Sequence, residues 1–282
     1  MRGIKTICVC GAGTMGSGIA QVCAQAGFQT IQFDVNEAML SKSMALIKKN
    51  LLILSEKDKI GIAEKDAIIE RIVFTNNIQI CRADLIIEAI IENKEAKINL
   101  FNQLAAINNS ETIFASNTSS ISIHSIANEI KYSQQVVGMH FFNPAPLMKL
   151  VEVIKTETTN NEVIELIVAV CKEMNKTAVI CKDVPGFIVN RVARQYYLEA
   201  MKLIELGFAT IETVDAIMQA TGFKMGPFKL MDLIGLDINY SVSKIVWNNL
   251  GKPERLKPSI IQQQKVDANE LGRKTGKGFH QY

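Results

Sequence analysis

The architecture of this chain follows from one short segment, Gly11-Ala12-Gly13-Thr14-Met15-Gly16. It comes after an apolar, β-branched run at residues 4–10 and before a stretch whose apolar residues recur with helical spacing. A glycine turn between a strand and a helix is typical of folds that bind dinucleotides. Gly11 permits the tight turn, Gly13 lets the backbone approach a pyrophosphate, and Gly16 lets the helix pack closely on the strand. The N–H groups and the positive end of the helix dipole then face the phosphates.

A second apolar run follows the helical stretch and ends at Asp34. A carboxylate at the end of the second strand accepts hydrogen bonds from a ribose diol, and it would repel the 2′-phosphate of NADP. Residues 35–37 contain no Arg or Lys that could bind such a phosphate. The alternative, a glycine turn that only lets a strand pack on a helix, does not explain Asp34. We therefore expect NAD as the cofactor, with contacts from Gly11, Ala12, Gly13, Thr14, Met15, Gly16 and Asp34.

Length and composition limit the classes of protein to which the chain can belong. Its 282 residues are enough for one large domain or two ordinary ones, and 48% of them are apolar. A net charge of +3, from 31 basic and 28 acidic residues, is too small to indicate a nucleic-acid-binding surface. No apolar run approaches the ~18 residues that span a bilayer, and the start leads directly into a strand, so we expect neither a membrane segment nor a signal peptide. The six cysteines match no metal or disulfide pattern, which favours reduced thiols in the cytoplasm.

Strands alternate with helices over roughly the first 180 residues. Apolar residues at spacings of three and four predict one long amphipathic helix from residue 36 to about residue 71. Residues 84–89 form a near-continuous apolar run, as expected of a central parallel strand that is covered on both faces. The remaining pattern predicts strands at 72–75, 112–116, 135–139, 149–154 and 177–180, and helices at 94–106 and 162–174. This alternation predicts an α/β fold, namely a Rossmann-type, doubly wound and mostly parallel sheet.

The pattern changes at the turn-forming segment Asp183-Val184-Pro185-Gly186. Beyond it, helical periodicity occupies residues 189–206, 211–221 and 236–250, and a glycine ends each of these stretches. We therefore expect an NAD-binding domain at residues 1–183 and a smaller all-α C-terminal domain at residues 184–282.

The predicted long helix carries lysines on its polar face. A lysine face is usually only solvated, and the alternative is an arm that meets an anionic substrate. The lysines are Lys42, Lys48, Lys49 and Lys57.

His140 is the histidine best placed for acid–base chemistry near neutral pH. It ends a β-branched strand, and ligands of open α/β sheets bind outside the carboxyl ends of the strands. The hydroxyl-rich loop at residues 116–120 follows another strand, where it either lines the same site or caps the helix after it. Of the other two histidines, His124 falls on an exposed helical position and His280 lies in the tail.

Glu152 lies inside an apolar strand, where a carboxylate is costly unless it has a partner. The alternation of the strand could instead turn this side chain outward. If it points inward, a histidine is the natural partner, because a carboxylate fixes the imidazole tautomer and stabilises the imidazolium in general-base catalysis. Asn190 follows the Pro185-Gly186 turn, a position that suits an amide reaching back across a domain cleft or an ordinary surface helix start.

Five blocks of the sequence resemble the signature blocks of the 3-hydroxyacyl-CoA dehydrogenases. They occur in the family's order, and the similarity runs from the glycine motif to the tail. The short bacterial members that act on 3-hydroxybutyryl-CoA are the most similar in length. The blocks are ASNTSS at 115–120, GMHFFNP at 138–144, MKLVEVI at 148–154, PGFIVNR at 185–191 and GRKTG at 272–276.

The resemblance implies a role for each matching residue. His140 would be the general base and Glu152 its orienting partner. Ser119 would hydrogen-bond the 3-oxygen of the substrate, and Asn190 would support that oxygen or the thioester. The long helix would contact coenzyme A through Asn50 and Lys57. The implied cofactor contacts beyond the glycine turn and Asp34 are Glu92, Lys97, Ser119, Asn143 and Lys274.

The resemblance also implies an activity, which is the NAD-dependent interconversion of (3S)-3-hydroxyacyl-CoA and 3-oxoacyl-CoA. The implied substrates are short-chain acyl-CoA esters of fatty-acid β-oxidation and butanoate metabolism, and no metal is needed. It implies a cytoplasmic homodimer, formed through the C-terminal substrate and dimerisation domain. Two alternatives remain at this point. One is an NAD-dependent dehydrogenase of a hydroxy acid without coenzyme A, and the other is a non-catalytic NAD-binding protein.

Overall fold

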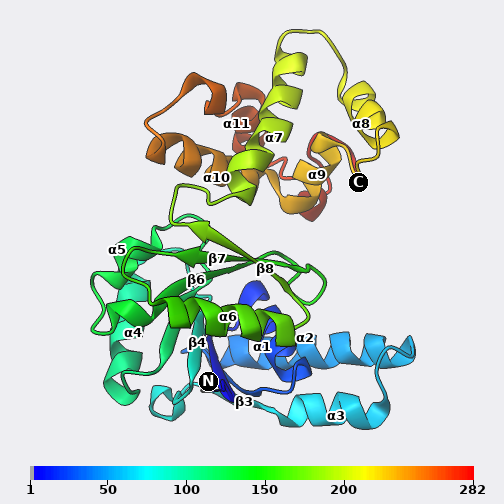
Figure 1. Ribbon diagram of the computed structural model, residues 1–282. Helices are drawn as coiled ribbons and strands as arrows, with labels where there is room; N and C mark the ends of the chain where they lie inside the picture. The colour runs from blue at the N-terminus through cyan, green and yellow to red at the C-terminus, as the bar shows by residue number, and fades with distance from the viewer. Residues whose placement is uncertain (1–2) are drawn as a thin grey trace. The chain divides into compact units, whose positions relative to one another are not determined.

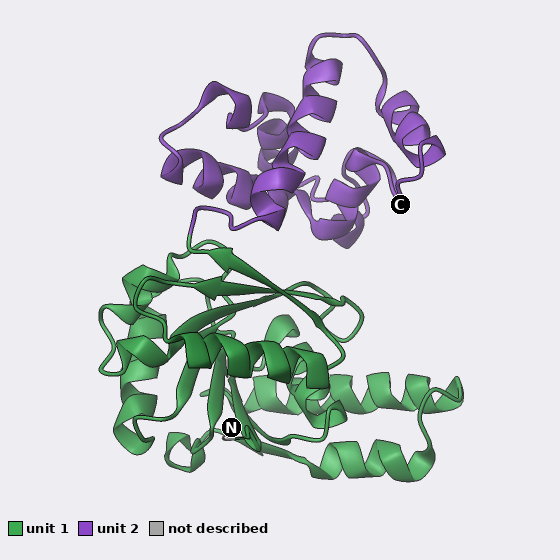
Figure 2. Cartoon of the chain, viewed as in Figure 1, with its two compact units in different colours: residues 1–183 green, residues 184–282 purple. Residues whose placement is uncertain are grey.

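The computed structural model describes residues 3–282. The chain divides into two compact units, Met1–Asp183 and Val184–Tyr282, which Figure 2 colours separately. The first unit combines a β-sheet with surrounding helices, and the second unit is helical (Figure 1). The predicted fold class, a doubly wound sheet followed by a smaller all-α part, is confirmed.

Within the described residues, the strands of the first unit form one sheet in the order β3-β2-β1-β4-β5-β6-β7-β8. Neighbouring strands are parallel except for β6 and β7, which are antiparallel. The chain passes from β1 to β2 and β3 on one side and then to β4 on the other, so strand order reverses between β1 and β4. Ligands of open α/β sheets bind at such a point, beside the carboxyl ends of the strands. The bounds are β1 Thr6–Cys10, β2 Gln29–Phe33, β3 Ile72–Thr75, β4 Leu85–Glu88, β5 Ile113–Ser116, β6 Val136–Phe141, β7 Leu150–Lys155 and β8 Thr177–Lys182.

The core of the first unit forms where apolar strands meet the first helix. Ile7 of β1, Ile19 of the helix and Leu85 of β4 are completely buried in one cluster. This cluster fills the face of the sheet on which α1 packs, and Ile86 of β4, on the opposite face, is also 0% exposed, so the central strand is covered on both faces, as its continuous apolar run predicts. The helices and 3₁₀ turns are α1 Thr14–Gln25, α2 Glu37–Glu56, α3 Ile62–Glu70, η1 Ile78–Ile80, α4 Lys94–Ile107, α5 Ile123–Ala127, η2 Ser133–Gln135 and α6 Asn161–Glu173.

The single long helix predicted after Asp34 was wrong, because the structure has two helices there, α2 and α3. Lys57 ends α2, and Asp58 adopts a left-handed conformation with φ of 52°. A continuing helix cannot pass through that conformation, whereas a turn can. Gly61 then provides the extended N-cap of α3. Apolar periodicity continues on both sides of the turn and therefore hides it.

The second unit packs helices around its own apolar core. Met201, Phe228, Met231 and Leu236 are completely buried there. The three predicted helices correspond to α7, α8 and α10, but α9 and α11 were not predicted. Among the described residues, no helix combines the length and apolar character that crossing a membrane requires. The elements are α7 Val189–Glu205, α8 Ile211–Ala220, α9 Pro227–Ile234, α10 Leu236–Asn249, η3 Glu254–Leu256, α11 Ile260–Asp267 and η4 Arg273–Thr275.

Candidate active site

The glycine turn between β1 and α1 has two crowded positions and one open position. Gly11 has φ of 104°, and a Cβ atom on it would lie 2.5 Å from the Ala89 carbonyl oxygen. A Cβ atom on Gly16 would lie 1.9 Å from the Gly11 carbonyl oxygen, so helix and turn are in close contact. A Cβ atom on Gly13 would meet nothing within 4 Å. Gly13 also gives α1 no side-chain cap. The turn therefore fits a dinucleotide pyrophosphate, because its open side exposes backbone N–H groups at a helix N-terminus.

Asp34 lies one residue beyond β2, against the glycine turn. Its Oδ2 accepts a hydrogen bond from the Ala12 amide at 2.7 Å, and its Oδ1 accepts one from the Asn36 amide at 2.9 Å. A carboxylate has about four lone-pair sites, so these two bonds orient the group and leave capacity for ribose hydroxyls. The position fits the predicted NAD contact.

His140 and Glu152 face one another across the antiparallel pair β6 and β7, where they are register partners. The His140 Nδ1 and Glu152 Oε2 atoms are 2.8 Å apart. The two residues are only 6% and 1% exposed, so Glu152 points inward rather than to solvent. Because a carboxylate only accepts, this bond places the proton of a neutral His140 ring on Nδ1 and makes Nε2 the basic nitrogen. The ring of Phe142 packs against the imidazole, with centroids 4.6 Å apart.

Ser119 lies in the loop that follows β5, and this loop is held by hydrogen bonds rather than used as a helix cap. The Glu92 Oε1 atom accepts bonds from Thr118 Oγ1 at 2.5 Å, from the Ser119 amide at 3.2 Å and from Ser120 Oγ at 2.7 Å. Burial by itself raises the pKa of Glu92, but the charge of Lys97 and the loop hydroxyls outweigh it and lower the pKa below its ordinary value. Helix α5 is capped instead by Ser122.

The same loop is joined to the strand that carries His140. The Asn117 Oδ1 atom accepts a hydrogen bond from the Phe141 amide at 2.8 Å. Ser119 and His140 therefore belong to adjacent segments at the carboxyl ends of β5 and β6. The structure thus brings the predicted serine loop and the predicted base to the same edge of the sheet.

Lys97 of α4 is almost completely buried, at 1% exposure. Its Nζ is 2.6 Å from Glu88 Oε1 and 3.2 Å from Glu92 Oε2. Glu88, at the end of β4, is 0% exposed, and it was not among the residues predicted from the sequence. The signal was present, because Glu88 is an acid in an apolar strand just as Glu152 is. A direct contact between Lys97 and the cofactor stays a prediction.

Asn143 lies in the loop after β6, where it is exposed. Lys176, which the sequence analysis also missed, fixes this loop by donating from Nζ to the Ala145 carbonyl at 2.6 Å and the Met148 carbonyl at 2.7 Å. Burial, followed by the charge of Lys149, lowers the pKa of Lys176. The loop therefore has a defined conformation next to the β6 end that carries His140.

Asn190 and Lys274 belong to the second unit. Asn190 is the second residue of α7 and is partly exposed. The Lys274 Nζ atom lies 2.6 Å from both carboxylate oxygens of Asp237. Burial by itself raises the pKa of Asp237, but the hydrogen bond from Lys274 and the Lys274 charge act in the opposite direction, so the pKa is lowered overall. Their contacts with a cofactor or substrate stay predictions.

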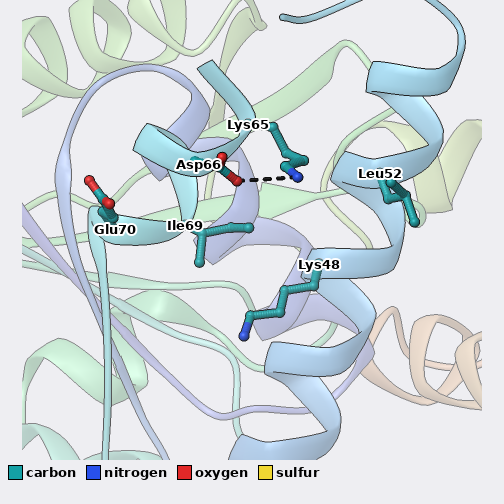
Figure 3. Close-up of a pocket in the computed structure, with 6 residues that line it drawn as sticks. All are labelled: Lys48, Leu52, Lys65, Asp66, Ile69 and Glu70. Atoms are coloured by element: carbon teal, nitrogen blue, oxygen red, sulfur yellow. Dashed lines mark ion pairs between the residues drawn. The ribbon is translucent and has the colours of Figure 1, made fainter. Parts of the chain in front are cut away.

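The predicted coenzyme A residues lie on α2 and at its C-cap. Asn50 Nδ2 donates to Gln21 Oε1 of α1 at 3.0 Å, and Lys57 is exposed at the end of the helix. A pocket between α2 and α3 is shown in Figure 3, with Lys48 and Leu52 on its α2 side. At ~100° per residue, Asn50 projects from the opposite side of α2. The pocket is therefore on another side of α2 than Asn50, although Lys48 of the predicted lysine face lines it. Its lining residues are Lys48, Leu52, Lys65, Asp66, Ile69 and Glu70.

Comparison with known proteins assigns both parts of the chain to models of a single family. Residues 6–184 match the model described as "3-hydroxyacyl-CoA dehydrogenase, NAD binding domain", and residues 186–282 match the C-terminal domain of the same family. A probable 3-hydroxybutyryl-CoA dehydrogenase of Bacillus subtilis is 41% identical over 99% of this chain and 98% of its own length. The 3-hydroxyadipyl-CoA dehydrogenase of Escherichia coli is 41% identical over 100% of this chain, which spans only 60% of that relative's length. The crystal structure of (S)-3-hydroxybutyryl-CoA dehydrogenase from Ralstonia eutropha has a TM-score of 0.95 and 35% identity, and it is covered over 99% of both chains.

Proposed function

The chain belongs to the 3-hydroxyacyl-CoA dehydrogenase family, and we propose that it interconverts (3S)-3-hydroxyacyl-CoA and 3-oxoacyl-CoA with NAD as the hydride carrier. The observation that carries the proposal is the buried His140–Glu152 pair, with 2.8 Å between Nδ1 and Oε2, in the same unit as the glycine turn. This arrangement provides a base and a nucleotide-binding turn on one sheet. The relatives named for 3-hydroxybutyryl-CoA support a short acyl chain.

His140 performs the proton transfer. In the oxidation direction its Nε2 accepts the proton of the 3-hydroxyl group, so the ring becomes an imidazolium while C3 loses a hydride. In the reduction direction the imidazolium returns that proton to the forming alkoxide. Glu152 stabilises the imidazolium in both directions through Nδ1 and keeps the ring oriented. Such assistance typically contributes ~10²–10⁴-fold to the rate.

Groups around the glycine turn would hold the cofactor. The backbone N–H groups at the start of α1 receive the pyrophosphate, and Asp34 receives the ribose hydroxyls. Bound NAD⁺ supplies the acceptor for the C3 hydride. The further proposed cofactor contacts are Glu92, Lys97, Ser119, Asn143 and Lys274.

Ser119 and Asn190 provide polar contacts for the substrate. The Ser119 hydroxyl donates to the 3-oxygen, so that partial negative charge on this atom is stabilised as hydride transfers. Asn190 supports the same oxygen or the thioester carbonyl. Asn50 and Lys57 contact coenzyme A from α2, where the lysine face meets its phosphates.

The proposal also includes a homodimeric state and a cytoplasmic location. The second unit exposes apolar side chains such as Phe208, at 74%, and a homodimer formed through this unit would cover them. The six cysteines are free and buried, which suits a reducing cytoplasm. The enzyme then acts on short-chain acyl-CoA esters in fatty-acid and butanoate metabolism.

One experiment separates this function from its alternatives. The protein is mixed with NADH and acetoacetyl-CoA, and the loss of nicotinamide absorbance is followed. We expect turnover with acetoacetyl-CoA and almost none with free acetoacetate, and a series of acyl lengths then measures the chain preference. A dehydrogenase of acids without coenzyme A would turn over only the free acid. A non-catalytic binding protein would bind NADH and consume none.

A further inference from the structure

We propose that Glu88, Lys97 and Glu92 form a positioning unit that holds the Ser119 loop in its working conformation. The inference rests on the proposed function, because it concerns the loop that carries the substrate-binding serine. Glu88 is a new member of the site, and Lys97 is assigned a positioning task in addition to its proposed cofactor contact. The unit acts through hydrogen bonds to the loop, and neither Glu88 nor Lys97 touches the reacting atoms.

The first part of the unit is a buried ion pair at the end of β4. Glu88 and Lys97 are 0% and 1% exposed, and their charged atoms are 2.6 Å apart. Glu88 Oε1 also accepts the Ile90 amide at 2.7 Å. A buried pair of this kind adds little net stability compared with apolar residues of similar size. Stability alone therefore does not explain why two charges are buried here, whereas a role in positioning the loop does.

The second part is the connection from Lys97 to Glu92. Glu88 is buried, whereas the side chain of Glu92 is 38% exposed, and one ammonium group contacts both carboxylates. The 3.2 Å contact between Lys97 Nζ and Glu92 Oε2 holds one oxygen of the Glu92 carboxylate. The other oxygen, Oε1, is thereby directed at the loop. Lys97 therefore determines where Glu92 can accept hydrogen bonds.

The third part is the loop itself, which both acids contact. Glu92 Oε1 accepts from Thr118, Ser119 and Ser120. Glu88 Oε2 accepts from Ser116 Oγ at 2.6 Å, and Ser116 Oγ in turn accepts the Thr118 amide at 3.2 Å. The bonds thus lead from one cation, through two carboxylates, to both ends of the segment that carries Ser119.

The same strand end also supports the cofactor turn. The residue after Glu88, Ala89, donates its amide to the Cys10 carbonyl at 2.7 Å and lies against Gly11. Displacement of the β4 end would therefore disturb the glycine turn and the serine loop together. A misplacement of about 1 Å is enough to reduce turnover roughly 100-fold.

The test uses Lys97→Met, Glu88→Gln and the double variant in the full chain. Glu88→Gln leaves the Lys97 charge buried beside a single carboxylate, so we expect its Tm to fall by roughly 10 °C. The double variant removes both buried charges, and we expect its Tm to recover most of that loss. The Ser119 loop of the double variant should nevertheless be held less firmly than in the wild type, because Glu92 has no cation to orient it. Lys265→Met breaks a separate Lys–Glu contact of 2.6 Å in the second unit and serves as the control.

Two readouts are recorded on each variant. Hydrogen exchange of the Ser119 and Ser120 amides, measured without any ligand, should be about tenfold faster in Lys97→Met and in the double variant than in the wild type and the control. Turnover of acetoacetyl-CoA should fall between about 10- and 100-fold in the same two variants, with an unchanged pH profile because His140 is intact.

Each contrary outcome points to a different failure. If the double variant has both the Tm and the turnover of the wild type, the positioning unit has only a structural role, and the positioning role is overturned. Weaker NADH binding in Lys97→Met with wild-type amide exchange would make Lys97 a cofactor contact only, which also overturns the positioning role. A wild type that is inactive on acetoacetyl-CoA contradicts the proposed function. Hydrogen exchange of the loop amides still decides whether the positioning unit holds the loop.

Discussion

At the scale of single residues, the carboxylate of Glu152 can be removed without removing the base it orients. In Glu152→Gln the imidazolium that forms on His140 during proton transfer loses its negative partner, so the charged ring is less well stabilised. We expect a loss of turnover of acetoacetyl-CoA with NADH that is smaller than the loss in a His140 replacement. Steady-state turnover of the two variants and the wild type measures this. A Glu152→Gln protein with wild-type turnover would exclude the pairing as a catalytic feature.

Glu92 provides a second residue-scale prediction, on stability and pH. Its pKa is lowered, so its ionised form contributes stability above the ordinary glutamate value of about 4.3 and loses that contribution as the pH falls through the lowered value. We expect the Tm difference between wild type and Glu92→Gln to be constant above about pH 5 and to shrink below about pH 4.3. Thermal melts of both proteins from pH 3 to 8 test this. A Tm difference that grows on acidification would contradict the direction.

Two glycines of one turn make a matched test at the scale of elements. Gly13→Ala adds a methyl group where nothing lies within 4 Å, so we expect an unfolding free energy within about 0.5 kcal/mol of the wild type. The same methyl group blocks the approach of a pyrophosphate, so the Kd for NADH should rise about tenfold or more, which is ~1.4 kcal/mol. Thermal melts and NADH titration measure the two effects. Unchanged NADH binding in a folded Gly13→Ala protein would place the pyrophosphate elsewhere.

Gly16→Ala is the contrasting variant. Its methyl group would lie 1.9 Å from the Gly11 carbonyl oxygen, so α1 must move away from the turn. We expect a loss of stability of roughly 1–3 kcal/mol, as for other overpacked sites, together with weaker NADH binding. A Gly16→Ala protein with wild-type Tm would show that the Gly11 carbonyl oxygen does not limit how closely α1 packs on the turn.

Elements differ in how well the sequence predicts them, for physical reasons. The strands follow from their apolar runs, because buried parallel strands must be apolar on both faces. The break at Asp58 could not be predicted, since the left-handed residue leaves no trace in the apolar period. Helix α9 is only eight residues long, so its apolar spacing is too short to distinguish a helix from another buried segment, and α11 is rich in glutamine and carries no clear amphipathic pattern.

Some residues of the site could be predicted from the sequence and others could not, for a similar reason. His140 and Glu152 are only 12 residues apart in the chain, and an acid in an apolar strand indicates a buried partner. Their meeting depends on the antiparallel register of β6 and β7, which spacing alone does not specify. Glu88 is also an acid in an apolar strand, but it lies in no segment that resembles a signature block. The side chain of Lys176 donates to backbone carbonyls, and such bonds leave no pattern in the sequence.

At the scale of the whole molecule, the testable property is the assembly. We expect sedimentation equilibrium at micromolar concentration to give twice the 31.2 kDa mass of one chain. Exposed apolar residues of the second unit should carry the contact, so Phe208→Glu combined with Ile217→Glu should shift the protein toward monomer. Ile62→Glu, at an equally exposed apolar position of the first unit, is the control and should stay dimeric. A wild type that sediments as a monomer would contradict the expectation.

The proposed reaction requires that His140 transfer the proton while NADH delivers the hydride. A single-turnover experiment with NADH, acetoacetyl-CoA and excess enzyme, followed by nicotinamide absorbance, tests it most directly in wild type and His140→Ala. We predict that His140→Ala binds NADH within about twofold of the wild type and consumes it between about 10²- and 10⁴-fold more slowly. Consumption at the wild-type rate by the alanine variant would contradict this requirement.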